Sequence, residues 1–444
     1  MNKIFYLLVF CVFCMSHKIQ AKLFDAEEFY LDNGLRVIVN ENHKAPIAKL
    51  MLWYKVGAMD EVAGKSGLAH LLEHLMFRGT SQIPNSKFNE IMLTNGVENN
   101  AFTSRDFTVY HALSDISRLE LVMALEADRM ANLQINNEAF KNEQKVVYQE
   151  REERVKNNSK TQFGEEINKI LWQNTPYEHP ISGTLAEINA LKKEDALAFY
   201  HQYYTPSNAT LIISGDVTPK EIKILAEKYF GPVKNTQNLI KRKMTFSVSE
   251  KSDVTIYKEM PHIESVKILI TYIVPAILEN PKEAFALSVF SNYLGESGNS
   301  YFQKELVQKQ KVLSAGSGVD LLTRGSGTFS VSMLPQEQNN LQESISLLEK
   351  DIQEALLKLN PELLEKEKKK ILSTLVYVKD NPEDAAYIIG TLASLGLSLN
   401  EIENYASNIE NVSIEDVRNA VKNMLTKSKK MTAILAPQKE VEND

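Results

Sequence analysis

The fold of this chain of 444 residues is indicated most clearly by one stretch, Ser66-Gly67-Leu68-Ala69-His70-Leu71-Leu72-Glu73-His74-Leu75-Met76-Phe77-Arg78-Gly79-Thr80. Apolar residues fill the positions between the polar ones and Gly79 ends the run, which predicts a short buried helix. Residues four apart lie on the same face of a helix, so His70 and His74 can direct two imidazoles to one point. This is the minimal geometry for two nitrogen ligands of a zinc ion.

Glu73 stands next to His74 and three residues after His70, so its carboxylate is expected beside the metal. A zinc ion lowers the pKa of a bound water to about 7, and a neighbouring carboxylate can then take the proton. The order H-x-x-E-H is the inverzincin pattern. The alternative is an amphipathic helix with two structural histidines, which we consider weaker for this quintet in its apolar setting.

A third protein ligand is expected, because catalytic zinc sites hold three protein ligands and a water molecule. Residues 136–156 are predicted to form a long helix with Asn136 as its N-cap. Glu143 and Glu150 are seven apart on one face of this helix, with apolar Val146 and Val147 between them. A merely solvated charged face is the alternative, and the residues alone leave both interpretations open.

Two strands are predicted over residues 97–103 and 107–113, around a turn at Ser104-Arg105-Asp106. From the residues alone, Asn100 is best interpreted as an ordinary polar group at a strand edge. His111 on the second strand is interpreted as structural rather than as a ligand.

The composition is that of a globular protein, with 43% hydrophobic and 24% charged residues. The net charge of −7 does not indicate the basic surface that binds nucleic acid, so no nucleic-acid partner is expected. Strands and helices are mixed without strict alternation, which favours the α+β class. A polar, basic segment at 234–250 is predicted to be a linker between domains at 22–233 and 251–444.

The two halves repeat each other weakly. Sliding one along the other places Val289 opposite His70, Asn292 opposite Glu73 and Tyr293 opposite His74. The second copy is therefore expected to have no metal chemistry.

The chain resembles the pitrilysin/insulinase family of zinc metallopeptidases. Within this family it most resembles the branch of the mitochondrial processing peptidase and its bacterial relatives. The resemblance covers nearly the whole chain after the first residues, and its motifs occur in order. They are Asp32-Asn33-Gly34-Leu35-Arg36-Val37, the stretch from Gly67 to Thr80, Asn100-Ala101-Phe102-Thr103-Ser104, Pro176-Tyr177, Tyr204-Thr205-Pro206-Ser207-Asn208-Ala209 and Ser214-Gly215-Asp216-Val217.

The resemblance implies one Zn²⁺ per chain, held by His70, His74 and Glu150, with Glu73 as the catalytic base. It implies a supporting role for Glu143 close to the ligand histidines, which need such an acceptor to fix their tautomer. It also implies a clamshell of two homologous α/β-sandwich-type domains, of which only the N-terminal one carries the metal. The expected activity is zinc-dependent hydrolysis of extended peptides or unfolded protein segments.

In the family, the strand that matches Asn100, Ala101 and Phe102 lies at a sheet edge beside the metal. The substrate joins it as an extra strand, so backbone hydrogen bonds give affinity with little side-chain selectivity. The resemblance therefore implies substrate-binding roles for these three residues.

The second half departs from the family pattern. Catalytically complete relatives carry an arginine and a tyrosine there, but the matching positions in this chain are Tyr301 and Ser314. In two-subunit relatives the partner chain supplies this pair, so we expect this chain to be the zinc-carrying subunit of a two-chain enzyme with a second homologous subunit. The alternatives are a non-catalytic peptide-binding or scaffold subunit and, disfavoured by the collinear motifs, a zinc hydrolase of another fold.

Residues 1–21 have the pattern of a signal peptide, with Lys3 followed by an apolar run too short to span a bilayer comfortably. Both cysteines, Cys11 and Cys14, lie in this leader, so no disulfides and no thiolate zinc ligands are expected after its removal. We expect export to a bacterial periplasm or secretion, with no stable membrane span in the mature chain. A lipidated leader and an uncleaved anchor are the alternatives.

Overall fold

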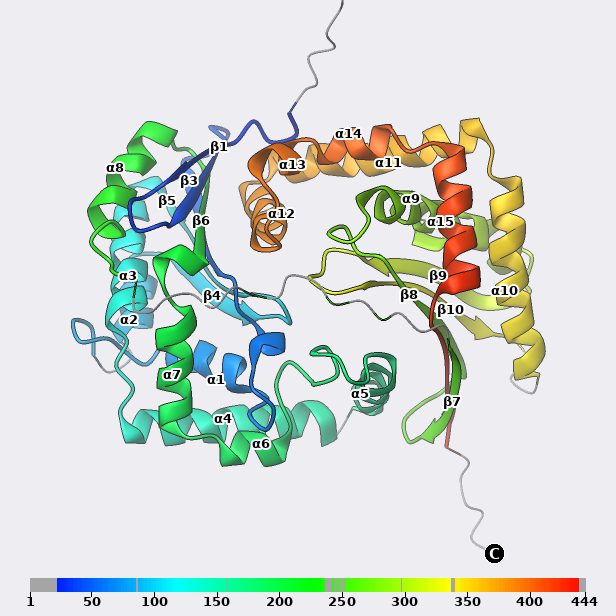
Figure 1. The fold of residues 1–444 in the computed structure, drawn as a ribbon, viewed down its shortest axis with the longest axis horizontal. Coiled ribbons are helices and arrows are strands. Elements are labelled where there is room, and N and C mark those ends of the chain that lie inside the picture. The colour runs from blue at the N-terminus through cyan, green and yellow to red at the C-terminus, as the bar shows by residue number, and fades with distance from the viewer. Residues whose placement is uncertain are drawn as a thin grey trace, which may run out of the picture.

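The computed structural model describes residues 22–84, 87–156, 158–235, 242, 246, 248, 252–296, 298–336 and 340–438. The expected leader, with Cys11 and Cys14, lies outside the described residues, as does most of the expected linker. The domain limits 22–233 and 251–444 therefore stay predictions. The described chain forms two sheets, each covered by helices on both faces (Figure 1).

The first sheet has six strands in the order β1-β2-β6-β3-β5-β4. Its strands are β1 (Glu27–Tyr30), β2 (Arg36–Glu41), β3 (Ile47–Tyr54), β4 (Glu98–Thr103), β5 (Thr108–Asp115) and β6 (Ala209–Gly215). Only β2 and β6 pair in parallel, and β4 lies at an edge beside β5. The predicted strands at 97–103 and 107–113 are thus confirmed as β4 and β5.

The second sheet has five strands in the order β7-β11-β8-β10-β9. Its strands are β7 (Asp253–Met260), β8 (Lys267–Val274), β9 (Val312–Asp320), β10 (Gly327–Pro335) and β11 (Lys430–Pro437). Each strand has the neighbours and the directions of β2, β6, β3, β5 and β4 in the first sheet, because β7 and β11 pair in parallel and the other pairs are antiparallel. The α+β class and the predicted repeat are confirmed.

The first half contributes the helices that carry and support the metal motif. They are α1 (Leu68–Leu75), α2 (Lys87–Thr94), α3 (Leu119–Asn132), α4 (Asn137–Lys156), α5 (Ser159–Leu171), α6 (Leu185–Ala190), α7 (Lys193–Tyr203) and α8 (Pro219–Tyr229). Leu50 and Leu52 of β3 face the core that α1, α3, α7 and α8 share. Met51 and Trp53 alternate with them and face the opposite side, as the twofold period of a strand requires.

The second half is richer in helices. They are α9 (Pro281–Ser291), α10 (Leu341–Lys358), α11 (Pro361–Asp380), α12 (Pro382–Ser394), α13 (Leu399–Glu403), α14 (Tyr405–Glu410) and α15 (Ile414–Lys427). The α9 helix continues through a π-helical turn at Asn292–Glu296. This helix follows β8 as α1 follows β3, and none of Val289, Asn292 and Tyr293 is a histidine, cysteine or carboxylate, the usual ligands of zinc.

The two halves exchange helices. The α12 helix, from the second half, lies against β3 and β6 of the first sheet, while α5 from the first half lies against β11 of the second (Figure 1). Gly390 permits the close approach of α12, since a Cβ at this position would lie 2.1 Å from the indole of Trp53. Each sheet is therefore covered on one face by its own half and on the other by the opposite half.

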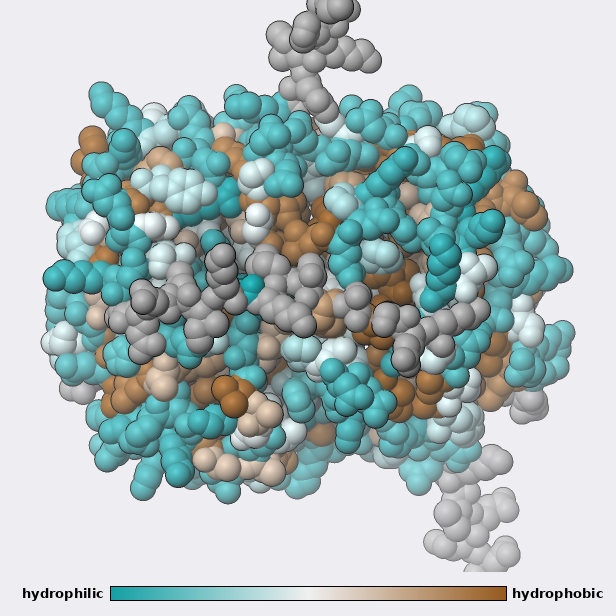
Figure 2. Space-filling model, viewed as in Figure 1, coloured by the Kyte–Doolittle hydropathy of each residue, from teal (hydrophilic) through white to brown (hydrophobic). Residues whose placement is uncertain are grey.

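The distribution of hydrophilic and hydrophobic residues on the surface agrees with this packing of the helices on the two sheets. In Figure 2 hydrophilic residues cover most of the rim of this face, and hydrophobic residues show near its middle, at the places of α12 and the second sheet. Within the described ranges, no helix combines the length and the apolar character that a bilayer span needs.

Candidate metal centre

Gly67 is the N-cap of helix α1, and its φ of +87° is a left-handed conformation that favours glycine. The carboxylate of Glu61 caps this end, because its two oxygens accept the backbone N–H groups of Gly67 at 3.0 Å and Ala69 at 2.7 Å. These N–H groups have no partner inside the helix, and the positive end of the helix dipole favours a carboxylate there. Burial nevertheless raises the pKa of Glu61 to about 8.

Three predicted ligands converge at the next turn of α1. The Nε2 atoms of His70 and His74 lie 3.8 Å and 3.5 Å from one carboxylate oxygen of Glu150 on α4. One ligand atom from each residue lies within 4.8 Å of the other two, and this is the one such group of histidines and acidic residues among the residues that the structure describes. Two imidazole nitrogens and one carboxylate oxygen are the donor set of many catalytic zinc sites, so the residues present fit the metal.

Glu143 lies on α4 two helical turns before Glu150 and contacts the other side of His74. Its Oε2 is 3.2 Å from His74 Nδ1, and its Oε1 is 2.5 Å from the guanidinium of Arg78. A proton on Nδ1 would be held by this carboxylate, which leaves the Nε2 lone pair of His74 directed at Glu150. Arg154 donates to the remaining oxygen of Glu150 at 2.6 Å.

The two histidines differ in their electrostatic environment. Burial lowers the pKa of His70 to about 3, aided by the charges of His74 and Arg154, so this imidazole is neutral and free to act as a ligand. Burial also acts to lower the pKa of His74, but the hydrogen bond with Glu143 and the nearby carboxylates raise it overall. Metal binding must displace any proton on Nε2, which couples zinc affinity to pH.

Glu73 projects from α1 toward the edge strand. Its Oε2 accepts a hydrogen bond of 2.5 Å from the hydroxyl of Thr103, the last residue of β4. Burial raises the pKa of Glu73 and the Thr103 bond partly opposes this rise. A carboxylate with a raised pKa that is held in one orientation has the properties of a general base.

The three predicted substrate-binding residues lie on β4, and their surroundings differ. Asn100 is exposed and lines a pocket of about 330 Å³ together with Glu73 and His74. Ala101 packs toward the core that includes α1, whereas Phe102 points to the opposite face and packs against Tyr387 of α12. The structure therefore brings Asn100 beside the candidate ligands and turns the Phe102 side chain away from them.

The sequence interpretation missed three residues of this site: Thr103, Arg78 and Glu61. Thr103 stands two residues after Ala101, so strand alternation could have placed it on the α1 side. Arg78 follows His74 at helical spacing. Glu61 gave no local signal, because its contact to the start of α1 crosses a loop.

The two positions that depart from the family pattern lie elsewhere. Tyr301 is buried in the core of the second half, with its hydroxyl 3.3 Å from the amine of Lys358. Ser314 is an exposed residue of β9.

Comparison with known proteins agrees with this geometry. Residues 36–185 match the model of the insulinase family (peptidase family M16), and residues 190–371 match the peptidase M16 inactive domain. The chain is 31% identical over 309 residues to the zinc protease PqqE of Helicobacter pylori, a match that covers 68% of each chain. It is also 31% identical over 201 residues to a probable mitochondrial-processing peptidase subunit beta of Schizosaccharomyces pombe, covering 45% of this chain and 44% of that one.

A solved structure gives the same result over nearly the whole chain. The crystal structure of a protease from Helicobacter pylori has a TM-score of 0.81 at 25% sequence identity, and it covers 94% of this chain and 100% of its own. The chain therefore belongs to the pitrilysin/insulinase family, peptidase family M16.

Proposed function

We propose that this protein is a zinc-dependent endopeptidase that hydrolyses extended peptides or unfolded protein segments. The observation that carries the proposal is the convergence of His70, His74 and Glu150 on one point, with the carboxylate of Glu73 beside it and an edge strand next to that carboxylate. Its relatives that are named zinc proteases support the same reaction class.

In this proposal His70, His74 and Glu150 would hold one zinc ion. When bound, zinc supplies Lewis acidity, which lowers the pKa of water and polarises a carbonyl group. Glu73 takes the proton of the attacking water and returns it to the amine that leaves. Glu143 keeps the imidazole of His74 in one tautomer and orientation.

The edge strand β4 supplies the substrate-binding element. Its outer edge has no neighbouring strand among those that the structure describes, so an extended peptide can pair with it through backbone hydrogen bonds. The exposed Asn100 lies along this edge at the pocket that holds Glu73. Recognition through the backbone requires an extended, unfolded substrate segment. It gives little selectivity for the amino-acid sequence of that segment.

We also propose a two-chain enzyme exported by the leader at residues 1–21 to a periplasm or outside the cell. The support for a second homologous subunit is that Tyr301 lacks the guanidinium expected at its position and Ser314 lacks the phenol expected at its own. A preorganised donor to a developing oxyanion contributes about 10²–10³ in turnover, so a partner that supplies one would matter.

The test is a peptide-cleavage assay on the purified zinc-loaded chain, beside Glu73→Gln. The substitution should leave bound zinc unchanged and lower turnover by about 10²–10⁴. Glu90→Gln is the matched control, because Glu90 is an exposed residue of α2 that should leave turnover unchanged. Cleavage that persists in Glu73→Gln would contradict the assignment of the base.

A silent but folded and zinc-occupied wild-type chain would contradict a self-sufficient enzyme. Activity that appears only after a homologous chain with the arginine and tyrosine is added would establish the two-chain form. Silence with that chain present would favour the non-catalytic peptide-binding subunit. His74→Ala should lose the metal, and full zinc occupancy in this variant would contradict the ligand assignment.

A further inference from the structure

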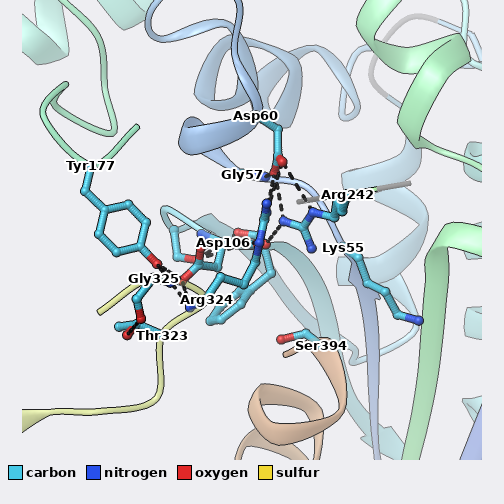
Figure 3. A network of polar contacts seen from close by, with 12 residues as sticks. Lys55, Gly57, Asp60, Asp106, Tyr177, Arg242, Thr323, Arg324, Gly325 and Ser394 are labelled. Carbon is cyan, nitrogen blue, oxygen red and sulfur yellow. Dashed lines mark hydrogen bonds and ion pairs between the residues drawn. The ribbon is translucent and has the colours of Figure 1, made fainter. Parts of the chain in front are cut away.

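A buried polar network joins the two halves of the molecule (Figure 3). Arg324 lies between β9 and β10 in the second half, and its side chain is only 2% exposed. Its Nη1 lies 3.0 Å from both carboxylate oxygens of Asp60 in the first half. Its backbone N–H donates to Asp106 Oδ2 at 3.2 Å, and the hydroxyl of Tyr177 donates to the same oxygen at 2.7 Å.

Arg242, from the segment between the halves, completes the network. Its Nη2 donates to Asp60 Oδ2 at 2.8 Å and also to the backbone carbonyl of Asp106. Two guanidinium groups thus face two carboxylates away from solvent. Removing one partner of such a buried pair is strongly unfavourable, and the planar arginine fork fixes the orientation of the carboxylate that it binds.

Asp60 is next in sequence to Glu61, the residue that caps α1. The two adjacent carboxylates bind different structures: Asp60 contacts Arg324 of the second half, and Glu61 holds the first N–H groups of the helix that carries His70 and Glu73. A shift of Asp60 would therefore be transmitted through one peptide unit to the start of α1.

Asp106 gives a second connection to the same helix. It lies three residues after Thr103, whose hydroxyl holds Glu73. The turn between them is bonded to the segment before Asp60, because Ala58 N–H donates to Ser104 O at 3.0 Å and Met59 N–H donates to Arg105 O at 3.0 Å. A Cβ at position 57 would lie 2.5 Å from both of these carbonyl oxygens, so the segment and the turn are packed without space between them.

We propose that Arg324 is a positioning residue for hydrolysis, through which the second half fixes the helix α1 and the orientation of Glu73, although the candidate ligands lie in the first half. The inference rests on the proposed peptidase function. It assigns to the second half a role at the active centre that requires neither a metal ligand nor a direct contact with substrate. The packing of the two halves and the orientation of Glu73 are therefore coupled, because both depend on the ion pairs of Asp60 and Asp106.

The experiment compares Arg324→Met with Lys49→Met. The buried Lys49 of β3 also makes an ion pair between the halves, 2.6 Å from the partly exposed Glu383 of α12, but its side chain makes no described hydrogen bond to residues 57–61 or 103–106. The two substitutions remove the same charge from the same interface, and only one of them lies in the network that reaches α1.

Two quantities are measured on the full chain: steady-state cleavage of a peptide, and hydrogen exchange of the Gly67 and Ala69 amides without substrate. Arg324→Met should lower kcat by about tenfold or more, with KM changed by less than about twofold, and should speed exchange of both amides by about tenfold. Lys49→Met should change each quantity by less than about twofold.

Equal effects of the two substitutions on kcat and on the Gly67 and Ala69 amides would overturn the inference, as would no effect of either. If Arg324→Met does not fold, Arg324→Lys carries the same comparison, because lysine keeps the charge but loses the planar guanidinium whose Nη1 contacts both oxygens of Asp60. A wild-type chain that stays without peptidase activity after a homologous second subunit is added would contradict the proposed function alone. The amide exchange would still test the connection from Arg324 to α1.

Discussion

The carboxylate of Glu73 is held from two directions. The helix α1 fixes its backbone. The hydroxyl of Thr103, on the edge strand, donates a hydrogen bond of 2.5 Å to the Oε2 atom of Glu73. A general base must lie within hydrogen-bond reach of the proton that it takes, so small rotations of this side chain are costly. The pairing of α1 and β4 through Thr103 is thus part of the proposed chemistry.

Replacing Thr103 should separate this role from packing. Thr103→Val keeps the shape but removes the donor, and a hydrogen bond to a charged group contributes about 1.5–3 kcal/mol, so kcat should fall by about tenfold or more. Thr103→Ser keeps the donor and should restore most of the activity. The measurement is kcat and KM for one peptide with all three proteins; equal kcat for valine and serine variants would contradict the role.

His111 supplies a pH-dependent contribution to stability. Burial lowers the pKa of this imidazole from 6.5 to about 4, with Lys49 adding to the effect. The unfolded chain therefore binds more protons than the folded chain between these values, so His111 makes stability fall as pH drops from 6.5 toward 4. Above pH 6.5 both states are neutral and the contribution is constant.

His111→Gln should remove this dependence. Urea unfolding at pH 7 and pH 5 should show that the wild-type chain loses more stability on acidification than the variant does. A control at pH 7 and pH 8 should show the same small difference for both proteins. Parallel losses between pH 7 and pH 5 would show that His111 is already exposed to protons in the folded state.

At the level of helices and strands, the sequence is sufficient to predict where a helix begins when capping residues mark its first turn. The helices α9, α11 and α12 begin at Pro281, Pro361 and Pro382, each after an asparagine N-cap, which is a pattern typical of a helix start. Asn136 likewise caps α4, with its side chain accepting from Ala139 N–H at 2.7 Å. These features depend on residues close in sequence.

Contacts between segments that are distant in sequence could not be predicted from local sequence patterns. The spacing of His70, Glu73 and His74 predicted one face of a helix, but the choice of Glu143 and Glu150 needed the family resemblance, because a charged helix face has several meanings. The apolar pattern of α12 does not indicate which sheet the helix packs against. Likewise, no local pattern predicts that Arg324 pairs with Asp60 across the molecule.

The packing of α12 on β3 gives a prediction about elements. Gly390→Ala would place a Cβ 2.1 Å from the Trp53 indole, so α12 must shift, and overpacking of this kind destabilises by about 1–3 kcal/mol. Gly164→Ala on α5 is the control, because no atom lies within 4 Å of its Cβ and alanine stabilises a helix interior by about 0.5–1 kcal/mol. Urea unfolding should therefore shift in opposite directions, and shifts of the same sign would refute the argument.

Across the whole molecule, the beginning of the described chain is attached to the second half. The carboxylate of Glu403, at the end of α13, accepts backbone N–H groups of Phe24, Asp25 and Ala26 at 2.8–3.2 Å. The segment that leads into β1 is therefore fixed by a residue almost 380 positions away. Together with the exchanged helices, this contact ties both halves into one body.

Glu403→Ala should release that segment. Three N–H groups would lose their acceptor, two of them on buried residues, at a cost of about 1–3 kcal/mol for each group that stays buried. The unfolding midpoint should fall and limited proteolysis should cut near residues 22–26. Glu410→Ala, at an exposed position of α14, should change neither result, and equal cutting in both variants would contradict the attachment.

The exchange of α5 and α12 also bears on why a chain with two similar halves keeps the half that carries none of the candidate ligands. If the second half were an independent module, its deletion would leave the first half, with the candidate ligands His70, His74 and Glu150, intact. Because α12 covers Trp53 and its neighbours on the first sheet, deletion would instead expose an apolar face and favour aggregation. The need to cover this face is thus sufficient to preserve the second half, although the candidate ligands His70, His74 and Glu150 all lie in the first.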